Sequence, residues 1–148
     1  MEAALMEEEE APLAAPEVDA RKRRVLVAED DPDMRRLIAT LLRMAGHKVA
    51  EAHDGMEILD RIESTIWKER PDLFDVIVSD VNMPGLSGLD VLAALRCAYW
   101  TTPVVLITAF GDEETRAEAK ALGAAAFLDK PVDPEELRNA VMQAASRP

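Results

Sequence analysis

The stretch DVIVSDVNMPGLSGLDVL, Asp75 to Leu92, decides the fold of this chain. Its apolar run, Val76 to Ser79, is typical of a strand buried inside a sheet. The run stops at one carboxylate, Asp80, and turn-forming residues follow at once, namely Asn82, Pro84, Gly85 and Gly88. We expect Asp80 at the carboxyl end of a central strand, where open parallel sheets bind ligands. Taken alone, an aspartate at this position more often only opens a turn, so the polar residues at the other strand ends decide between the two interpretations.

Strand-like and helix-like segments alternate around this stretch, which predicts a parallel sheet with right-handed crossovers. Strands are expected at 25–28, 48–52, 76–79, 104–107 and 126–128. Helices are expected to start at Pro32, Gly55, Leu89, Asp112 and Pro134. The sequences Asp31-Pro32 and Asp133-Pro134 are typical of a capping residue followed by the first helical position.

Two of these helices carry specific expectations. Helical spacing predicts a buried face for the first one, made of Leu37, Ile38, Leu41, Leu42 and Ala45. The helix over 112–122 is polar and rich in alanine, so its apolar face is weak. We expect this fourth helix to be the most mobile element.

Length and charge define the expected organisation and partners. The 148 residues fit one domain, and the net charge of -12 is uneven because residues 1–20 hold seven acids and no base. We expect a disordered acidic extension over 1–20 and one domain over 21–148. The domain's remaining charge of -5 argues against nucleic-acid binding. A single cysteine fits a cytoplasmic location, and we expect neither a membrane span nor a signal peptide.

Four of the five expected strands end in polar side chains: Glu29, Asp30, Asp80, Thr108 and Lys130. A parallel sheet brings these ends to one edge, so we expect one shallow pocket. Three clustered carboxylates repel one another unless a cation sits among them. Oxygen ligands favour Mg²⁺ over zinc, and both histidines, His47 and His53, are expected in loops away from the pocket. With Lys130 opposite the metal, such a pocket would bind a phosphoryl group.

The available nucleophile suggests the reaction. No serine, cysteine or histidine is placed at these strand ends, so we expect Asp80 to attack a phosphoryl donor and form an aspartyl phosphate. The protein would mainly position the group and neutralise its charge. Thr108 would donate its hydroxyl to the new phosphoryl oxygen, and the small Ala109 would leave the approach open.

Four strings in register resemble the receiver domains of two-component response regulators over about residues 23–145. They are VLVAEDDPDMRRLI, VIVSDVNMPGLSGLDVL, PVVLITA and FLDKP. The resemblance implies an α/β flavodoxin-like fold, in which a doubly wound (βα)5 sheet with strand order 2-1-3-4-5 lies between two helix layers.

The resemblance also implies residue roles. Asp80 would accept the phosphoryl group and, with Asp30, bind Mg²⁺, while Glu29 would act through water and the Asn82 carbonyl would complete the ligands. The phosphoryl group would be held by Thr108 and Lys130, with Ala109 and Asn82 beside it. A cis Lys130-Pro131 peptide would place the ammonium. Phe127 would be the switching aromatic that moves inward when Thr108 moves toward the phosphate.

By the same resemblance the chain would be a signalling switch and no multiple-turnover enzyme. Its donor would be a sensor histidine kinase or phosphotransfer protein, and its output face would combine the fourth helix, fifth strand and fifth helix. Whether phosphorylation also leads to a dimer is left open by the resemblance. Glu29 stands where the family more often has the first of two acidic residues as an aspartate. Since glutamate keeps the charge, the resemblance implies a changed affinity for the metal and no loss of metal binding. Phe110, two residues after Thr108, is hypothesised to shield the acyl phosphate from water.

Two alternatives compete with this interpretation. A phosphohydrolase of the haloacid-dehalogenase type also uses a strand-end aspartate, Mg²⁺, a threonine and a lysine. Such enzymes need a second aspartate two residues after the nucleophile as general acid, and Asn82 cannot deliver a proton there. The other alternative is a receiver that only docks to partners without phosphorylation, which the complete set of site residues argues against.

Overall fold

The computed structural model describes residues 22–67 and 74–146. Within these residues the strands are β1 Arg24–Ala28, β2 Lys48–Ala52, β3 Val76–Asp80, β4 Val104–Thr108 and β5 Ala126–Asp129. The helices alternate with them: α2 Pro32–Met44, α3 Gly55–Trp67, α4 Gly88–Cys97, α5 Glu113–Ala121 and α6 Pro134–Ala145. The predicted alternation is confirmed. The extension expected over residues 1–20 lies outside the described residues.

The five strands form one parallel sheet with the order β2-β1-β3-β4-β5, which confirms the fold class. The register sets the carboxyl ends of the central strands almost level, through the pairs Ala28–Ser79, Asp80–Ile107 and Thr108–Asp129. The residues at and just beyond these pairs therefore emerge along the same edge of the sheet.

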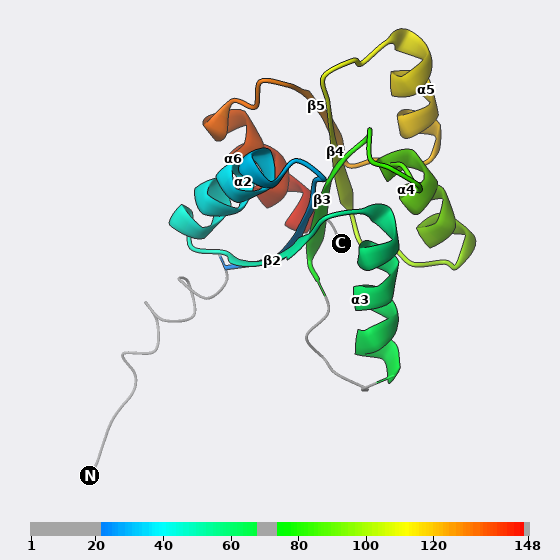
Figure 1. Cartoon of the computed structure of the whole chain (residues 1–148), viewed down its shortest axis with the longest axis horizontal. Coiled ribbons are helices and arrows are strands. Elements are labelled where there is room, and N and C mark those ends of the chain that lie inside the picture. The colour runs from blue at the N-terminus through cyan, green and yellow to red at the C-terminus, as the bar shows by residue number, and fades with distance from the viewer. Residues whose placement is uncertain (1–21, 68–73, 147–148) are drawn as a thin grey trace.

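Helices cover both faces of the sheet, with α2 and α6 on one side and α3, α4 and α5 on the other (Figure 1). Successive strand residues point to opposite faces, so each strand supplies both cores. Val25 and Val27 join the core that contains Ile38 of α2, whereas Leu26 joins the core that contains Ile58 of α3. The result is the expected three-layer arrangement.

The first turns of all five described helices are closed by side chains. Each capping oxygen accepts a backbone N–H two or three residues further along, and the caps are Asp31, Asp54, Ser87, Asp112 and Asp133. Such a cap contributes about 0.5–2 kcal/mol. Ser87 and Asp90 form a reciprocal capping box that the sequence interpretation did not single out. This box fixes the start of α4 directly after the loop that follows Asp80.

The burial of several side chains differs from the sequence-based expectation. Leu37 and Ala45, both predicted to be buried, are exposed, Leu37 by 49%, and Ala39 is buried on α2 instead. Helical spacing predicts a broad stripe, but the packing of α2 on the sheet selects which part of it is covered. His47 lies in the loop before β2, as expected, but it is buried there: it is only 6% exposed, and its Nδ1 accepts the Arg23 N–H at 3.1 Å.

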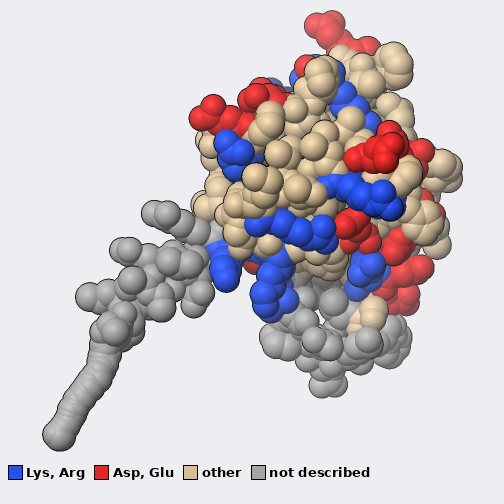
Figure 2. Space-filling view, turned by 60° about the vertical axis from the view of Figure 1, so that its left-hand side comes forward, with Lys and Arg blue, Asp and Glu red and all other residues tan. Residues whose placement is uncertain are grey.

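Helix length and surface charge bear on which partners the domain can meet. Among the residues that the structure describes, none of the helices is both long and apolar enough to cross a bilayer. On the face shown in Figure 2, several lysine and arginine side chains gather across the middle and lower part, with acidic side chains between and around them. Helix α5 buries only Ala119, in keeping with its weak apolar face, although its mobility stays a prediction.

Candidate phosphoryl-acceptor site

The predicted polar side chains meet at the carboxyl edge of the sheet. Glu29 follows β1, Asp80 and Thr108 end β3 and β4, and Lys130 follows β5. Glu29, Asp80 and Thr108 are 1%, 5% and 0% exposed, whereas Asp30 is exposed. Buried charged groups at strand ends are costly unless they are paired, so their partners define what the site can bind.

The three carboxylates face one another around a single ammonium. One oxygen from each of Glu29, Asp30 and Asp80 lies within 4.8 Å of the others. Lys130 Nζ lies 2.8 Å from Glu29 Oε1 and 3.4 Å from Asp80 Oδ2. One ammonium among three carboxylates leaves a deficit of positive charge, and a divalent cation bound by oxygen ligands would remove that deficit.

The electrostatics of the cluster show the same deficit. Burial raises the pKa of Glu29 to about 7, against the opposing hydrogen bonds from Lys130 and the Asp31 N–H. Burial alone would lower the pKa of Lys130, but its hydrogen bond to Glu29 and the nearby Asp80 charge outweigh that effect and raise it. Lys130 therefore stays charged, and Glu29 is close to neutralisation unless another cation joins the site.

The backbone around Asp80 is held by the loop that follows it. The Asn82 N–H donates to Asp80 Oδ1 at 3.3 Å, and the Gly88 N–H donates to the Val81 carbonyl at 2.9 Å. A Cβ at Gly88 would lie 2.5 Å from the Asp80 carbonyl oxygen, so no side chain fits there. The sequence identified Gly88 as a turn residue, but not this close approach, which brings the loop against the end of β3.

The hydroxyl oxygen of Thr108 accepts hydrogen bonds from two donors at the carboxyl edge of the sheet. Its Oγ1 accepts Asn82 Nδ2 at 3.3 Å and the Phe110 N–H at 3.1 Å. Ala109 is exposed, in agreement with an open approach. Phe110 is 80% exposed, so its ring contacts little of the protein and gives no support to the hypothesis that it shields the site.

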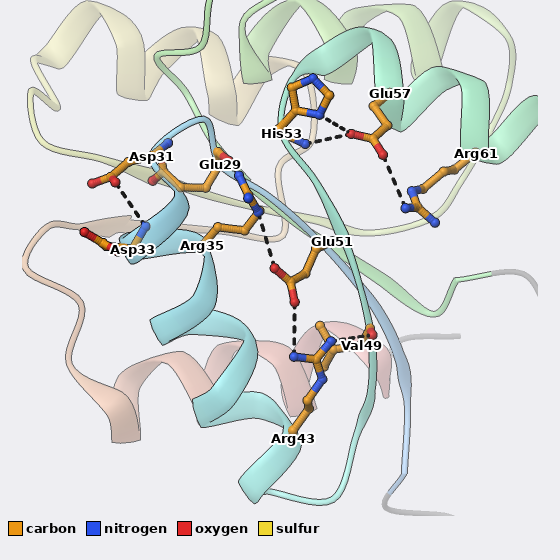
Figure 3. Close-up of polar contacts among 10 residues, drawn as sticks. All are labelled: Glu29, Asp31, Asp33, Arg35, Arg43, Val49, Glu51, His53, Glu57 and Arg61. Atoms are coloured by element: carbon orange, nitrogen blue, oxygen red, sulfur yellow. Dashed lines mark hydrogen bonds and ion pairs between the residues drawn. The ribbon is translucent and has the colours of Figure 1, made fainter.

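Arg35 of α2 supports the end of β1 and was missed by the sequence interpretation. Its Nη1 donates to the Glu29 carbonyl at 2.9 Å, and its Nε lies 3.3 Å from Glu51 Oε1 (Figure 3). Arg43 pairs with the other oxygen of Glu51 at 3.1 Å. Arg35 lies one helical turn after the cap Asp31, which is the signal that places its side chain near the end of β1.

The histidines lie outside this cluster, as expected. His53 pairs through Nδ1 with Glu57 at 2.6 Å and through Nε2 with Asp54 at 3.3 Å, on the loop into α3 and its first turn (Figure 3). The acidic cluster therefore contains oxygen ligands and one ammonium among the residues described. This donor set suits Mg²⁺ better than zinc.

A family model of the response regulator receiver domain matches residues 25–142. The chain belongs to this family. It is 38% identical over 114 residues to the transcriptional regulatory protein CpxR of Escherichia coli K12, a match covering 77% of this chain and 45% of that protein. It is 30% identical over 118 residues to sporulation initiation phosphotransferase F of Bacillus subtilis, covering 80% and 90% respectively. The chain thus spans about half the length of CpxR and most of the second relative.

Solved receiver structures share the fold. The receiver domain of the Francisella response regulator 1452 matches with a TM-score of 0.75 and 33% identity, covering 84% of this chain and 98% of that one. The chemotaxis response regulator CheY4 of Vibrio cholerae matches with a TM-score of 0.70 and 34% identity, covering 83% and 98%. Family and fold agree with a phosphorylation-dependent signalling switch and do not favour the haloacid-dehalogenase alternative.

Other predicted features of the receiver domain are also located. The Lys130–Pro131 peptide is cis, as the resemblance implied. Phe127 of β5 is partly buried, and the guanidinium carbon of Arg116 lies 4.7 Å from the centre of its ring. The sequence interpretation did not anticipate this arginine, because a charged residue on a polar helix usually faces solvent.

Proposed function

We propose that this receiver domain, over residues 21–148, accepts a phosphoryl group on Asp80 from a sensor histidine kinase or a phosphotransfer protein. The observation that carries the proposal is the position of Asp80: buried, central among the strand ends, and 3.4 Å from the Lys130 ammonium. A carboxylate can attack phosphorus, and the Lys130 ammonium lies where it can neutralise charge on an incoming phosphoryl group.

In the proposed reaction an Asp80 oxygen forms a bond to phosphorus while the bond between phosphorus and the donor's nitrogen or oxygen breaks. The leaving group takes the electron pair of that bond, so the step needs no oxidant or reductant. Lys130 exchanges part of its contact with Glu29 for a phosphoryl oxygen. This exchange keeps the ammonium close to the charge that is transferred.

The carboxylate cluster fits Mg²⁺, because it gathers oxygen ligands around too little positive charge. Asp30 and Asp80 would hold the ion directly, Glu29 would hold it through water, and the Asn82 carbonyl would complete the protein ligands. When bound, the ion would neutralise negative charge on the phosphoryl oxygens. The raised pKa of Glu29, caused mainly by its burial, supports the same assignment, because a cation would stabilise its ionised form.

The output of the switch would be a change of surface. Thr108 would leave Asn82 and the Phe110 N–H to donate its hydroxyl to the phosphoryl group, and Phe127 would follow inward. The face made of α5, β5 and α6 would then repack and change its affinity for a protein partner. The small buried contribution of α5 supports its role as the element that moves.

We further propose that the domain slowly hydrolyses its own aspartyl phosphate, acts in the cytoplasm, and contacts proteins without binding nucleic acid itself. CpxR is named as a transcriptional regulatory protein, but the match covers only 45% of it. The net charge of -5 over residues 21–148 supports the absence of nucleic-acid binding.

The test is intact-mass measurement after incubation with acetyl phosphate and Mg²⁺. We expect one phosphoryl adduct per wild-type chain and none on Asp80→Asn. Asp60→Asn is the matched control, because Asp60 is exposed on α3, away from the cluster. Equal labelling of wild type and Asp80→Asn would remove the assignment. Multiple-turnover phosphate release from a generic monoester would instead favour a hydrolase.

A further inference from the structure

Arg116, on the first turns of α5, binds two side chains of β5 at once. Its Nη2 donates to both carboxylate oxygens of Asp129, at 2.8 and 2.7 Å, and its guanidinium carbon stacks 4.7 Å from the Phe127 ring centre. Phe127 and Asp129 are two residues apart on one strand, so both point to the same face of the sheet. One guanidinium therefore ties α5 to the aromatic residue and to the residue before Lys130.

A second observation joins these contacts to the phosphoryl site. A Cβ built at Gly111 would lie 2.9 Å from the Phe127 ring, 3.0 Å from Asp129 Oδ1 and 3.1 Å from the Thr108 methyl group. The three side chains thus converge on the bare backbone of Gly111, in the loop between β4 and α5. Closely packed groups cannot move independently, so a movement of Thr108 would also displace Phe127 and Asp129.

We propose that Arg116 is a positioning residue that holds Phe127 and Asp129 in the unphosphorylated arrangement and thereby opposes phosphorylation of Asp80. The proposal rests on the proposed function and adds the regulation of that site. Inward movement of Phe127 must break its stacking with Arg116. A contact present in one conformation and absent in the other shifts the equilibrium toward the first.

The size of the effect follows from the two contacts. Arg116 and Asp129 are partly exposed, with side chains 42% and 63% accessible, so water weakens their ion pair. An exposed ion pair and an exposed cation–π contact each change an equilibrium by roughly two- to fivefold. We therefore expect loss of Arg116 to raise the population of the phosphorylation-competent conformation by roughly three- to tenfold. Because α5 buries only Ala119, few other contacts compensate.

The experiment compares initial rates of acetyl phosphate labelling, at one subsaturating concentration with Mg²⁺, by intact mass. We expect Arg116→Gln and Asp129→Asn each to label faster than wild type. The labelling rate of the double variant should increase by less than the product of the increases in the two single variants, because both substitutions remove the same contact. Arg116→Lys should fall between wild type and Arg116→Gln, since an ammonium keeps the charge but not the two-pronged bond.

The control is Arg138→Gln, which removes an equal charge from an exposed position on α6. Thermal unfolding of each variant separates a change in overall stability from a change in labelling. Unchanged or slower labelling of Arg116→Gln would overturn the proposal, as would equal acceleration by Arg138→Gln or independent effects in the double variant. If wild type and Asp80→Asn label alike, the proposed function itself has failed, which this comparison distinguishes.

Discussion

Replacement of Gly88 by alanine tests how closely the loop after Asp80 packs on the end of β3. The added Cβ would lie 2.5 Å from the Asp80 carbonyl oxygen, and 3.1 Å from both the Leu106 Cδ2 and the Ser79 Oγ. Overpacking of this kind costs about 1–3 kcal/mol of stability. The nearest atom here is a backbone oxygen, which moves aside less easily than the end of a flexible side chain, so we expect a cost near about 3 kcal/mol. Alanine recovers about 0.5–1 kcal/mol over glycine within a helix. The expected net loss is about 2 kcal/mol.

Urea denaturation measures this loss as a roughly 30-fold change in the unfolding equilibrium constant. The same substitution should slow acetyl phosphate labelling, because the loop can only fit the new methyl group by moving the Asp80 backbone. Gly85→Ala is the matched control. Gly85 has a φ of +77° and nothing within 4 Å of an added Cβ, so its cost comes from backbone strain of about 1 kcal/mol without contact to Asp80. A Gly88→Ala protein with wild-type stability and labelling would refute the close approach.

Three further outcomes are expected. Burial lowers the pKa of His47 below its ordinary value of 6.5. The stability that neutral His47 contributes is therefore present above about pH 6.5 and is lost as the pH falls toward the folded-state pKa. Urea titrations from pH 7.5 to about 5 should show a smaller loss of unfolding free energy for His47→Gln than for wild type, and an equal loss in both proteins would contradict this. Tyr99 has a φ of 58° and is 92% exposed, so its backbone lies in the left-handed region that favours glycine. Tyr99→Gly should therefore raise the free energy of unfolding by about 0.5–1 kcal/mol. A lower free energy of unfolding would instead mean that the tyrosine ring makes a stabilising contact. Asp30→Asn should require more Mg²⁺ for half-maximal labelling, and chelation of the metal should abolish labelling of the wild type; labelling that persists in excess chelator would exclude the metal requirement.

The sequence predicted the parts of this structure that depend on local chemistry. Strands that end in Asp80 and Thr108, and helices that begin after Asp31 and Asp133, follow from apolar runs, caps and prolines that act within a few residues. The convergence of the strand ends follows from parallel topology alone. For this reason the candidate cluster could be assembled before any coordinates.

Other features depend on contacts between distant segments, which a single sequence does not encode in a readable pattern. Arg35 and Arg116 look like ordinary solvent-facing residues of polar helix turns, yet one binds the Glu29 carbonyl and the other binds two residues of β5. The exposure of Leu37 likewise depends on how α2 lies against the sheet. The residues missed are therefore those whose roles arise from packing between elements.

The most direct measurement is chemical trapping of the phosphorylated protein. Borohydride reduces an aspartyl phosphate to homoserine, so peptide sequencing by mass spectrometry reads which carboxylate carried the phosphoryl group. The carboxylate beside the Lys130 ammonium, at the end of β3, should be the one converted, so homoserine is expected at position 80 and nowhere else. Homoserine at position 30, or phosphate recovered on a histidine, would contradict the account.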